Sequence, residues 1–105
     1  MEIIHLRPAR IIKVEGELHV YGMRLDLPKM RISSRVVRDW PDLEEPRVHW
    51  AQTETSVRRY RLRGLDEPFP VWCNAGILRR ILVDWGVDTD EIERVLIQIR
   101  RPALM

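Results

Sequence analysis

The clearest pattern in the chain is an alternation of apolar and polar residues between positions 11 and 27. A period of two is typical of β-strands with one buried face. Gly16 lies in the middle, where a tight reversal needs a residue that tolerates unusual backbone angles. The pattern predicts a β-hairpin with a three-residue loop over 15–17, which would set Val14 opposite Leu18 and Ile12 opposite Val20 on one face.

The same pairing would put Lys13, His19 and Tyr21 on the opposite, polar face. Beyond Gly22 the apolar positions change parity and become Met23, Leu25 and Leu27. One extra residue in a strand produces such a change, so we expect a β-bulge near Gly22.

A second alternating stretch runs from residue 47 to residue 63. A reversal over 53–57 would pair Trp50 with Tyr60 and Val48 with Leu62 as a second hairpin. The opposite face would then carry a row of basic residues, namely Arg47, His49, Arg59, Arg61 and Arg63.

The segment between the two hairpins predicts one or two helical turns and then an acidic loop. Ser33 or Ser34 can act as an N-cap, and Pro41 can end the helix. Val36, Val37 and Trp40 recur at about one helical turn.

Residues 74–85 predict an amphipathic helix. Asn74 can cap it, Gly86 can end it, and its apolar stripe comprises Ile77, Leu78, Ile81, Leu82 and Trp85. Segment 89–101 fits either a helix or a strand by its apolar spacing. A helix is favoured because Asp88 followed by Glu91 resembles a capping box.

Residues 79–96 also have the order of a DNA-binding helix-turn-helix motif. However, Asp88, Asp90 and Glu91 at the start of the second helix would repel DNA phosphates, whereas they suit the positive end of their own helix. We therefore interpret this region as an ordinary αα-hairpin.

Together these elements predict an α+β fold in a single small globular domain spanning residues 1–105. Its mainly antiparallel sheet would have about four strands, formed by the two hairpins. One or two C-terminal helices would cover one face of that sheet.

Composition changes this picture only a little. The net charge is +2, so a basic site must come from local segregation of charge. Lys13 and Lys29 are the only lysines, and such a bias toward arginine is typical of GC-rich coding in a bacterium or its phage. A single cysteine excludes an internal disulfide, and no apolar run approaches the length of a membrane span, so we expect a cytoplasmic protein with no membrane partner.

The candidate site is the polar face of the predicted sheet, which we call the predicted basic face. Like charges on neighbouring strands repel unless they are solvated, interleaved with carboxylates or bound to an anion. Cations with an aromatic ring and histidines among them suit single-stranded nucleic acid, which is held by phosphate contacts and stacking. An acidic protein surface and plain solvation are the other interpretations. The face comprises Lys13, His19, Tyr21, Arg47, His49, Arg59, Arg61 and Arg63.

The residue pattern indicates no catalytic group, metal or cofactor. Cys73 precedes a predicted helix, but none of the three histidines stands at a spacing that would make it a base for this thiol. We interpret Cys73 as a small buried residue. The histidines lie on separate strands without carboxylates at ligand spacing, so no metal site is predicted.

Our hypothesis from the sequence is a small non-enzymatic binding module that uses the predicted basic face to contact nucleic acid or a ribonucleoprotein. The alternative is a protein-interaction or structural subunit, such as a homo-oligomer or an accessory protein of a phage or bacterium, with no nucleic-acid contact. An exposed apolar patch of several hundred Å² would favour the alternative.

Overall fold

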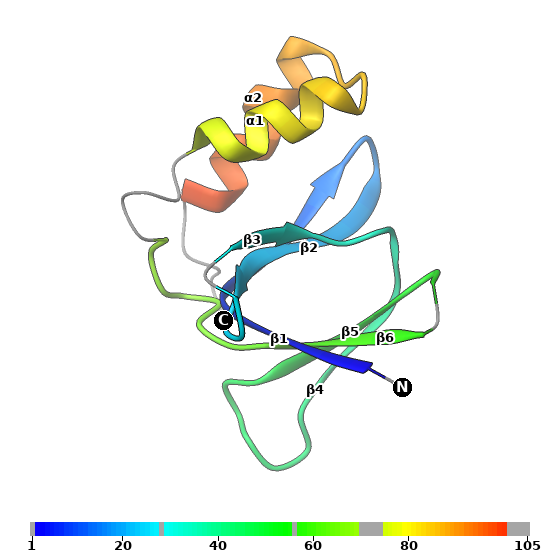
Figure 1. The fold of residues 1–105 in the computed structure, drawn as a ribbon, viewed down its shortest axis with the longest axis vertical. Helices are drawn as coiled ribbons and strands as arrows, with labels where there is room; N and C mark the ends of the chain where they lie inside the picture. The colour runs from blue at the N-terminus through cyan, green and yellow to red at the C-terminus, as the bar shows by residue number, and fades with distance from the viewer. Residues whose placement is uncertain (1, 28, 56, 70–74, 101–105) are drawn as a thin grey trace.

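The computed structural model describes residues 2–27, 29–55, 57–69 and 75–100. Six strands precede two helices in this part of the chain (Figure 1). They are β1 (Glu2–Val14), β2 (Glu17–Arg24), β3 (Met30–Ile32), β4 (Val36–Pro41), β5 (His49–Thr53), β6 (Arg58–Leu62), α1 (Ala75–Asp84) and α2 (Thr89–Arg100). The predicted α+β class and the C-terminal helices are confirmed, whereas the prediction of about four strands is too low.

The six strands form one sheet in the order β3-β2-β1-β6-β5-β4. Neighbouring strands are antiparallel except β1 and β6, which are parallel. The sheet curls so strongly that β4 approaches β2 across its concave side. The connection from β3 to β4 runs between β2 and β4. Within it, the Ser33 N–H donates to the Val20 carbonyl of β2 at 2.9 Å.

The first hairpin forms, but its predicted register is wrong by one residue. Glu15 and Gly16 alone make the turn, with φ of 51° and 83°. Two positive φ values in a two-residue turn match the twist of the flanking strands. Val14 therefore pairs with Glu17 and Ile12 with His19, so His19 shares a face with the apolar residues of β1.

The irregularity expected near Gly22 lies on the partner strand. The register shifts between Leu6 and Ala9, opposite Gly22, so the extra residue belongs to β1. A Cβ on Gly22 would come within 2.8 Å of the Pro8 carbonyl oxygen. Gly22 thus permits the close approach of the two backbones at the bulge.

The second hairpin also forms one residue out of the predicted register. Trp50 pairs with Arg61, and Tyr60 pairs with Ala51. Thr53 is buried and remains in β5, where its hydroxyl lies 3.1 Å from that of Thr55, and this shortens the loop to 54–57. Trp50 consequently lies on the face of the arginines and not on that of Tyr60.

The helical turns predicted after Ser33 are wrong, because this segment forms β3 and β4. The Ser33 hydroxyl accepts the Val20 N–H at 2.8 Å and donates to the Ser34 carbonyl at 2.7 Å. Ser33 thus satisfies backbone groups of the sheet rather than those of a helix end. The β-branched Val36 and Val37 favour an extended backbone in the strand that follows.

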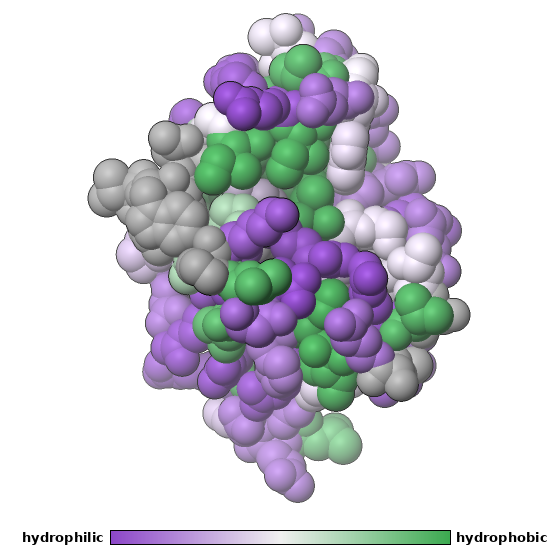
Figure 2. All heavy atoms as spheres, in the orientation of Figure 1, coloured by the Kyte–Doolittle hydropathy of each residue, from purple (hydrophilic) through white to green (hydrophobic). Residues whose placement is uncertain are grey.

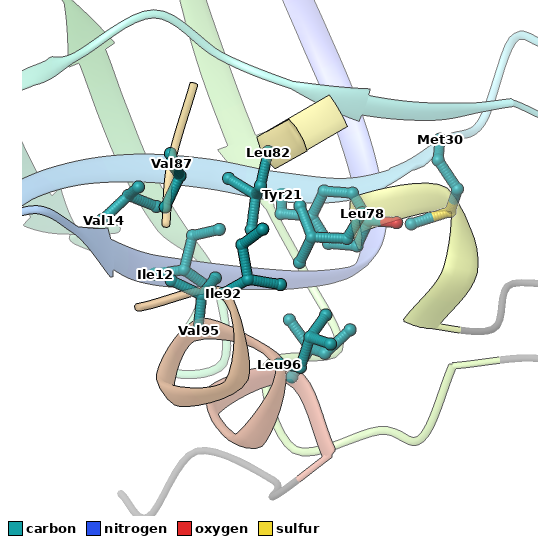
Figure 3. Close-up of a cluster of buried hydrophobic side chains, with 11 residues drawn as sticks. Ile12, Val14, Tyr21, Met30, Leu78, Leu82, Val87, Ile92, Val95 and Leu96 are labelled. Carbon is teal, nitrogen blue, oxygen red and sulfur yellow. The ribbon is translucent and has the colours of Figure 1, made fainter. Parts of the chain in front are cut away.

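Two apolar clusters stabilise the fold, one on each face of the sheet. The cluster on the concave face comprises Ile4, Leu6, Ala9, Val20, Val36, Ala51, Tyr60 and Leu62. On the convex face, α1 and α2 cover β1 and β2 and bury Ile12, Val14, Tyr21, Met30, Leu78, Leu82, Val87, Ile92, Val95, Leu96 and Ile99 (Figure 3). The helices leave the β6, β5 and β4 part of the convex face uncovered.

The predicted ends of both helices are confirmed wherever they fall on described residues. Gly86, with φ of 78°, ends α1, and the Val87 N–H donates to the Leu82 carbonyl at 3.0 Å, as in a Schellman motif. Asp88 caps α2, because its carboxylate accepts the Glu91 N–H at 3.0 Å. The helices pack as the predicted αα-hairpin, whereas Asn74 and Cys73 lie outside the described residues.

Side chains of α2 complete the backbone hydrogen bonding of β1 beyond the point where β6 ends. The Gln98 amide donates to the Lys13 carbonyl at 2.9 Å and accepts the Lys13 N–H at 2.8 Å. The Glu91 carboxylate accepts the Glu15 N–H. Glu91 therefore binds the β1–β2 turn, and α2 takes the place of a further strand at this edge.

Among the described residues, no helix is long and apolar enough to cross a membrane.

Candidate functional site

The uncovered half of the convex face carries guanidinium groups and indole rings in register across three strands. Trp40 pairs with Trp50, and Trp50 pairs with Arg61. In the next row, Arg38 pairs with Gln52 and Gln52 with Arg59. We call this surface the Arg–Trp face, and it comprises Arg38, Trp40, Trp50, Gln52, Arg59 and Arg61.

The two indole rings of this face lie parallel. The centroids of Trp40 and Trp50 are 6.5 Å apart, with 9° between their planes. The guanidinium carbon of Arg38 lies 4.4 Å from the Trp40 centroid, and that of Arg59 lies 5.7 Å from it. Such cation–π contacts hold both arginines against the aromatic surface.

The acidic loop between β4 and β5 folds against one edge of the Arg–Trp face. The Glu45 carboxylate accepts from Arg61 at 2.9 Å, and the Asp42 carboxylate accepts the Trp50 indole N–H at 2.7 Å. This indole bond, together with the backbone N–H groups of Glu45 and Glu44 at 2.9 and 3.0 Å, lowers the pKa of Asp42 from its usual range. The loop therefore fixes Trp50 and partly neutralises Arg61.

Other arginines on this side of the molecule have no such partner. No carboxylate of the described residues lies within ion-pair distance of Arg38, Arg59, Arg47 or Arg63. The Nε atoms of Arg59 and Arg63 are buried and have no hydrogen-bond acceptor among the described residues. These four guanidinium groups therefore carry charge that no ion pair of the described residues balances.

Arg63 and Arg47 line a pocket beside the Arg–Trp face, and its other charged lining residues are Arg7, Glu45, Asp66 and Glu67. The Arg63 N–H donates to the Leu6 carbonyl at 3.0 Å, which extends the pairing of β1 with β6. Arg7 binds Glu67 through two hydrogen bonds of 2.9 and 2.7 Å, and this pairing lowers the pKa of the Glu67 carboxyl. Arg63 and Arg47 therefore lie next to the Arg–Trp face in a pocket that carries both signs of charge, and Arg7 is already paired with Glu67.

The structure separates the predicted basic face into parts. Arg59 and Arg61 lie together on the uncovered convex face, and Arg47 and Arg63 flank it. His19 and Tyr21 lie beneath the helices, only 7% and 0% exposed, so their expected place on a solvated face is wrong. The shift of one residue in the first hairpin explains this, because it moves both side chains to the face that α1 and α2 cover.

Lys13 and His49 are also separate from the arginines. Lys13 pairs with Leu18 on an exposed part of the first hairpin, beyond the reach of β6. His49 pairs with Leu62 on the opposite parity from Trp50, and its Nε2 lies 2.7 Å from the Asp39 carboxylate. Neither residue joins the Arg–Trp face.

Sequence reasoning missed Arg38, Trp40 and Trp50 as members of the site. Arg38 and Trp40 have the same parity in a segment that also contains two β-branched valines, and this signal for a strand was present in the sequence. Trp50 was assigned to the apolar face only because the hairpin register was wrong. In the view of Figure 2, the lower end of the molecule around the β4–β5 connection is mostly hydrophilic.

Within the described residues, no group of three or more histidine, cysteine, aspartate or glutamate side chains is placed to hold a metal ion. Comparison of the chain with models of protein families, with curated proteins and with solved structures found no match. A functional assignment therefore rests on the chemistry of the site.

Proposed function

We propose that the protein is a small non-enzymatic binding module whose Arg–Trp face contacts single-stranded nucleic acid. The observation that carries this proposal is the parallel pair Trp40 and Trp50. Arg38 and Arg59 lie over the Trp40 ring, and neither has an ion-pair partner among the described residues. Indole rings provide stacking surfaces for bases, and arginines provide charge-assisted hydrogen bonds to phosphates.

The spacing of the arginines suits an extended strand of nucleic acid. Arg59 and Arg61 are two residues apart on β6, a separation of roughly 7 Å on a strand, which is close to the distance between phosphates of an extended single strand. Arg63 continues the row toward the pocket that Arg47 also lines. Phosphates that follow β6 would leave their bases over Trp50 and Trp40.

A single strand fits this surface better than a duplex. The arginines and indoles lie on strands of a convex sheet, and no helix projects from this part of the described structure into a groove. The helix that could have entered a groove, α2, begins with Asp90 and Glu91 in its first turn. These carboxylates would repel phosphates.

The second candidate partner is an acidic protein surface, and one contact favours it. Glu45 of this chain already binds Arg61, so the face accepts a carboxylate as well as it would accept a phosphate oxygen. Nucleic acid is preferred because the parallel indoles add a stacking surface that carboxylates do not need.

The test is the binding of fluorescently labelled single-stranded RNA and DNA, measured by anisotropy over a range of salt concentrations. Each lost phosphate contact changes the slope of log K against log salt by about 0.7 for a single strand. The double variant Arg59→Gln and Arg61→Gln is expected to flatten the slope by about 1 to 1.4. Trp40→Ala is expected to weaken binding by about 1 to 3 kcal/mol with little change in slope.

The matched control is the double variant Arg80→Gln and Arg100→Gln. It removes the same charge from the helices, where neither arginine has an ion-pair partner among the described residues. We expect this control to bind like the wild type. The proposal would be contradicted if no single strand binds at low salt, or if the control loses as much affinity as the Arg59 and Arg61 double variant. Selective binding of an acidic peptide would favour the second candidate.

A further inference from the structure

A second surface depression lies between the β1–β2 turn and the connection between α1 and α2. Figure 1 shows both segments at the end of the molecule away from β4. Its volume is about 340 Å³, and Val14, Glu15, Glu17, His19, Trp85 and Val87 line it. None of these residues belongs to the Arg–Trp face. We call this depression the turn pocket.

Hydrogen-bond acceptors dominate the polar lining of the turn pocket. The Glu15 and Glu17 side chains are exposed, and no described residue binds either carboxylate. Glu15 is bound only through its backbone N–H, which donates to Glu91. Both carboxylates are therefore free to accept hydrogen bonds from a ligand.

His19 adds a third acceptor from the wall of the pocket. The residue is only 7% exposed, and its Nδ1 lies 3.0 Å from the Ser33 carbonyl oxygen. A carbonyl oxygen only accepts, so Nδ1 carries the proton and donates. In the neutral ring this leaves the Nε2 lone pair without a partner among the described residues.

The apolar lining suits an alkyl chain that ends in a flat cation. Trp85 is 46% exposed, and its ring centroid lies 5.1 Å from that of His19. Val14 and Val87 provide aliphatic walls. A guanidinium group stacks on an indole and offers a planar fork of donors to carboxylates, whereas its alkyl stem packs on apolar side chains.

A metal ion is a poorer match for this lining. The described histidine and carboxylate side chains do not converge in any group that could hold a metal. An organic cation does not need such convergence, because its donors are spread over several ångströms. Trp85, Val14 and Val87 add stacking and aliphatic contacts that an organic cation can use and a metal ion cannot.

We propose that the turn pocket binds an alkylguanidinium group, with Glu17 and Glu15 accepting its N–H donors, His19 Nε2 adding a third acceptor, and Trp85 stacking on its plane. Two sources could supply this group, namely an arginine side chain of a partner protein or a free guanidinium metabolite. This site is independent of the proposed nucleic-acid function.

The test uses N-butylguanidinium as the probe and N-butylurea as its neutral analogue of the same shape. Binding is followed by NMR through the indole N–H signal of Trp85, which the Trp85→Phe variant identifies, and through the Nε2 signal of His19. We expect saturable shifts of both signals with butylguanidinium and none with butylurea. Glu17→Gln is expected to weaken binding about 5- to 10-fold, and Trp85→Ala by a similar factor.

The matched control is Glu2→Gln, which removes an exposed carboxylate from an ion pair with Arg58 at the opposite end of β1 from Val14. It is expected to leave the affinity unchanged. The second arm uses a tripeptide with a central arginine, acetylated at its N-terminus and amidated at its C-terminus. If it binds more tightly than butylguanidinium, the site is assigned to an arginine of a partner protein. If it binds more weakly, the site is assigned to a free metabolite. Equal response to butylurea, no saturable shift with either cation, or an unchanged affinity in Glu17→Gln would overturn the proposal.

Discussion

The two halves of the convex face of the sheet differ in whether the helices cover them. On β1 and β2, the outward side chains include Ile12, Val14 and Tyr21, and two helices cover them. On β6, β5 and β4, the corresponding side chains include Arg59 and Trp50, and neither helix covers them. The same backbone scaffold thus presents a core on one half and a binding surface on the other.

One inserted residue in β1 makes this division possible. Before the bulge, Ile4 and Leu6 point to the concave core, whereas after it Ile12 and Val14 point to the helices. Without the bulge, a strict period of two would keep all four side chains on one face. The comparison teaches that a short irregularity lets a single strand serve two cores.

The largest expected contrast between the halves is in stability. Leu96→Ala removes a fully buried side chain beneath the covered half and is expected to lower the free energy of unfolding by about 2 to 5 kcal/mol. Arg59→Gln on the uncovered half is expected to change it by no more than about 0.5 kcal/mol. Urea denaturation measures both, and Val83→Ala on an exposed helix position is the control. A large loss in Arg59→Gln would mean that the uncovered half is structural.

Gln98→Met tests how α2 is attached to the covered half. The substitution preserves the approximate shape but removes both hydrogen bonds to the backbone of Lys13. A loss of about 1 to 2 kcal/mol is expected, with faster hydrogen exchange at the Lys13 amide. Ile97→Ala, at the adjacent exposed position, should leave that exchange rate nearly unchanged. Unaltered exchange in Gln98→Met would show that the two bonds add nothing to the edge of β1.

Asp88→Ala tests the start of the second covering helix. Its carboxylate accepts the Glu91 N–H, so the loss of this cap is expected to cost about 1 kcal/mol. Asp90→Ala, which leaves the cap in place, is expected to cost less. Thermal unfolding distinguishes the two variants, and an equal effect of both would point to the helix dipole rather than to the cap.

The smallest effect is expected from Asp42, which holds the loop beside the uncovered half. Its pKa is lowered in the folded state, so its contribution to stability is present above its unfolded pKa of about 3.9 and is lost as pH falls through the lower folded pKa. Asp42→Asn is therefore expected to be less stable than the wild type at neutral pH, with a difference that narrows in acid. Unfolding curves recorded between about pH 2 and 7 measure this narrowing, and a difference independent of pH would assign the effect to loop geometry.

The sequence predicted most elements of the fold but not their relative registers. The turn of the first hairpin places Glu15, a non-glycine residue, at positive φ, and apolar spacing alone does not indicate such a turn. The parallel pairing of β1 with β6 also left no local signal, because it joins residues such as Glu2 and Arg58 that are 56 positions apart.

The candidate site was predicted in part for the same physical reason. The common parity of Arg59 and Arg61 depends only on their own strand, and the structure places both on one face. Their neighbours depend on register, so Trp50 was missed and His19 was wrongly included. Properties within a strand were accessible from the sequence, whereas properties between strands required the structure.

The division of β1 between two partner strands has a consequence for the order of folding. The C-terminal part of β1 pairs with β2 across a two-residue turn and can form this hairpin as soon as both segments leave the ribosome. The N-terminal part must wait for β6, which is synthesised more than 50 residues later, and the closure of so long a loop slows such a contact. Until then its apolar residues Ile4 and Leu6 have no core to enter. The nascent chain therefore exposes an unpaired strand edge for much of its synthesis, and this edge is the segment at which misassembly with another chain would begin.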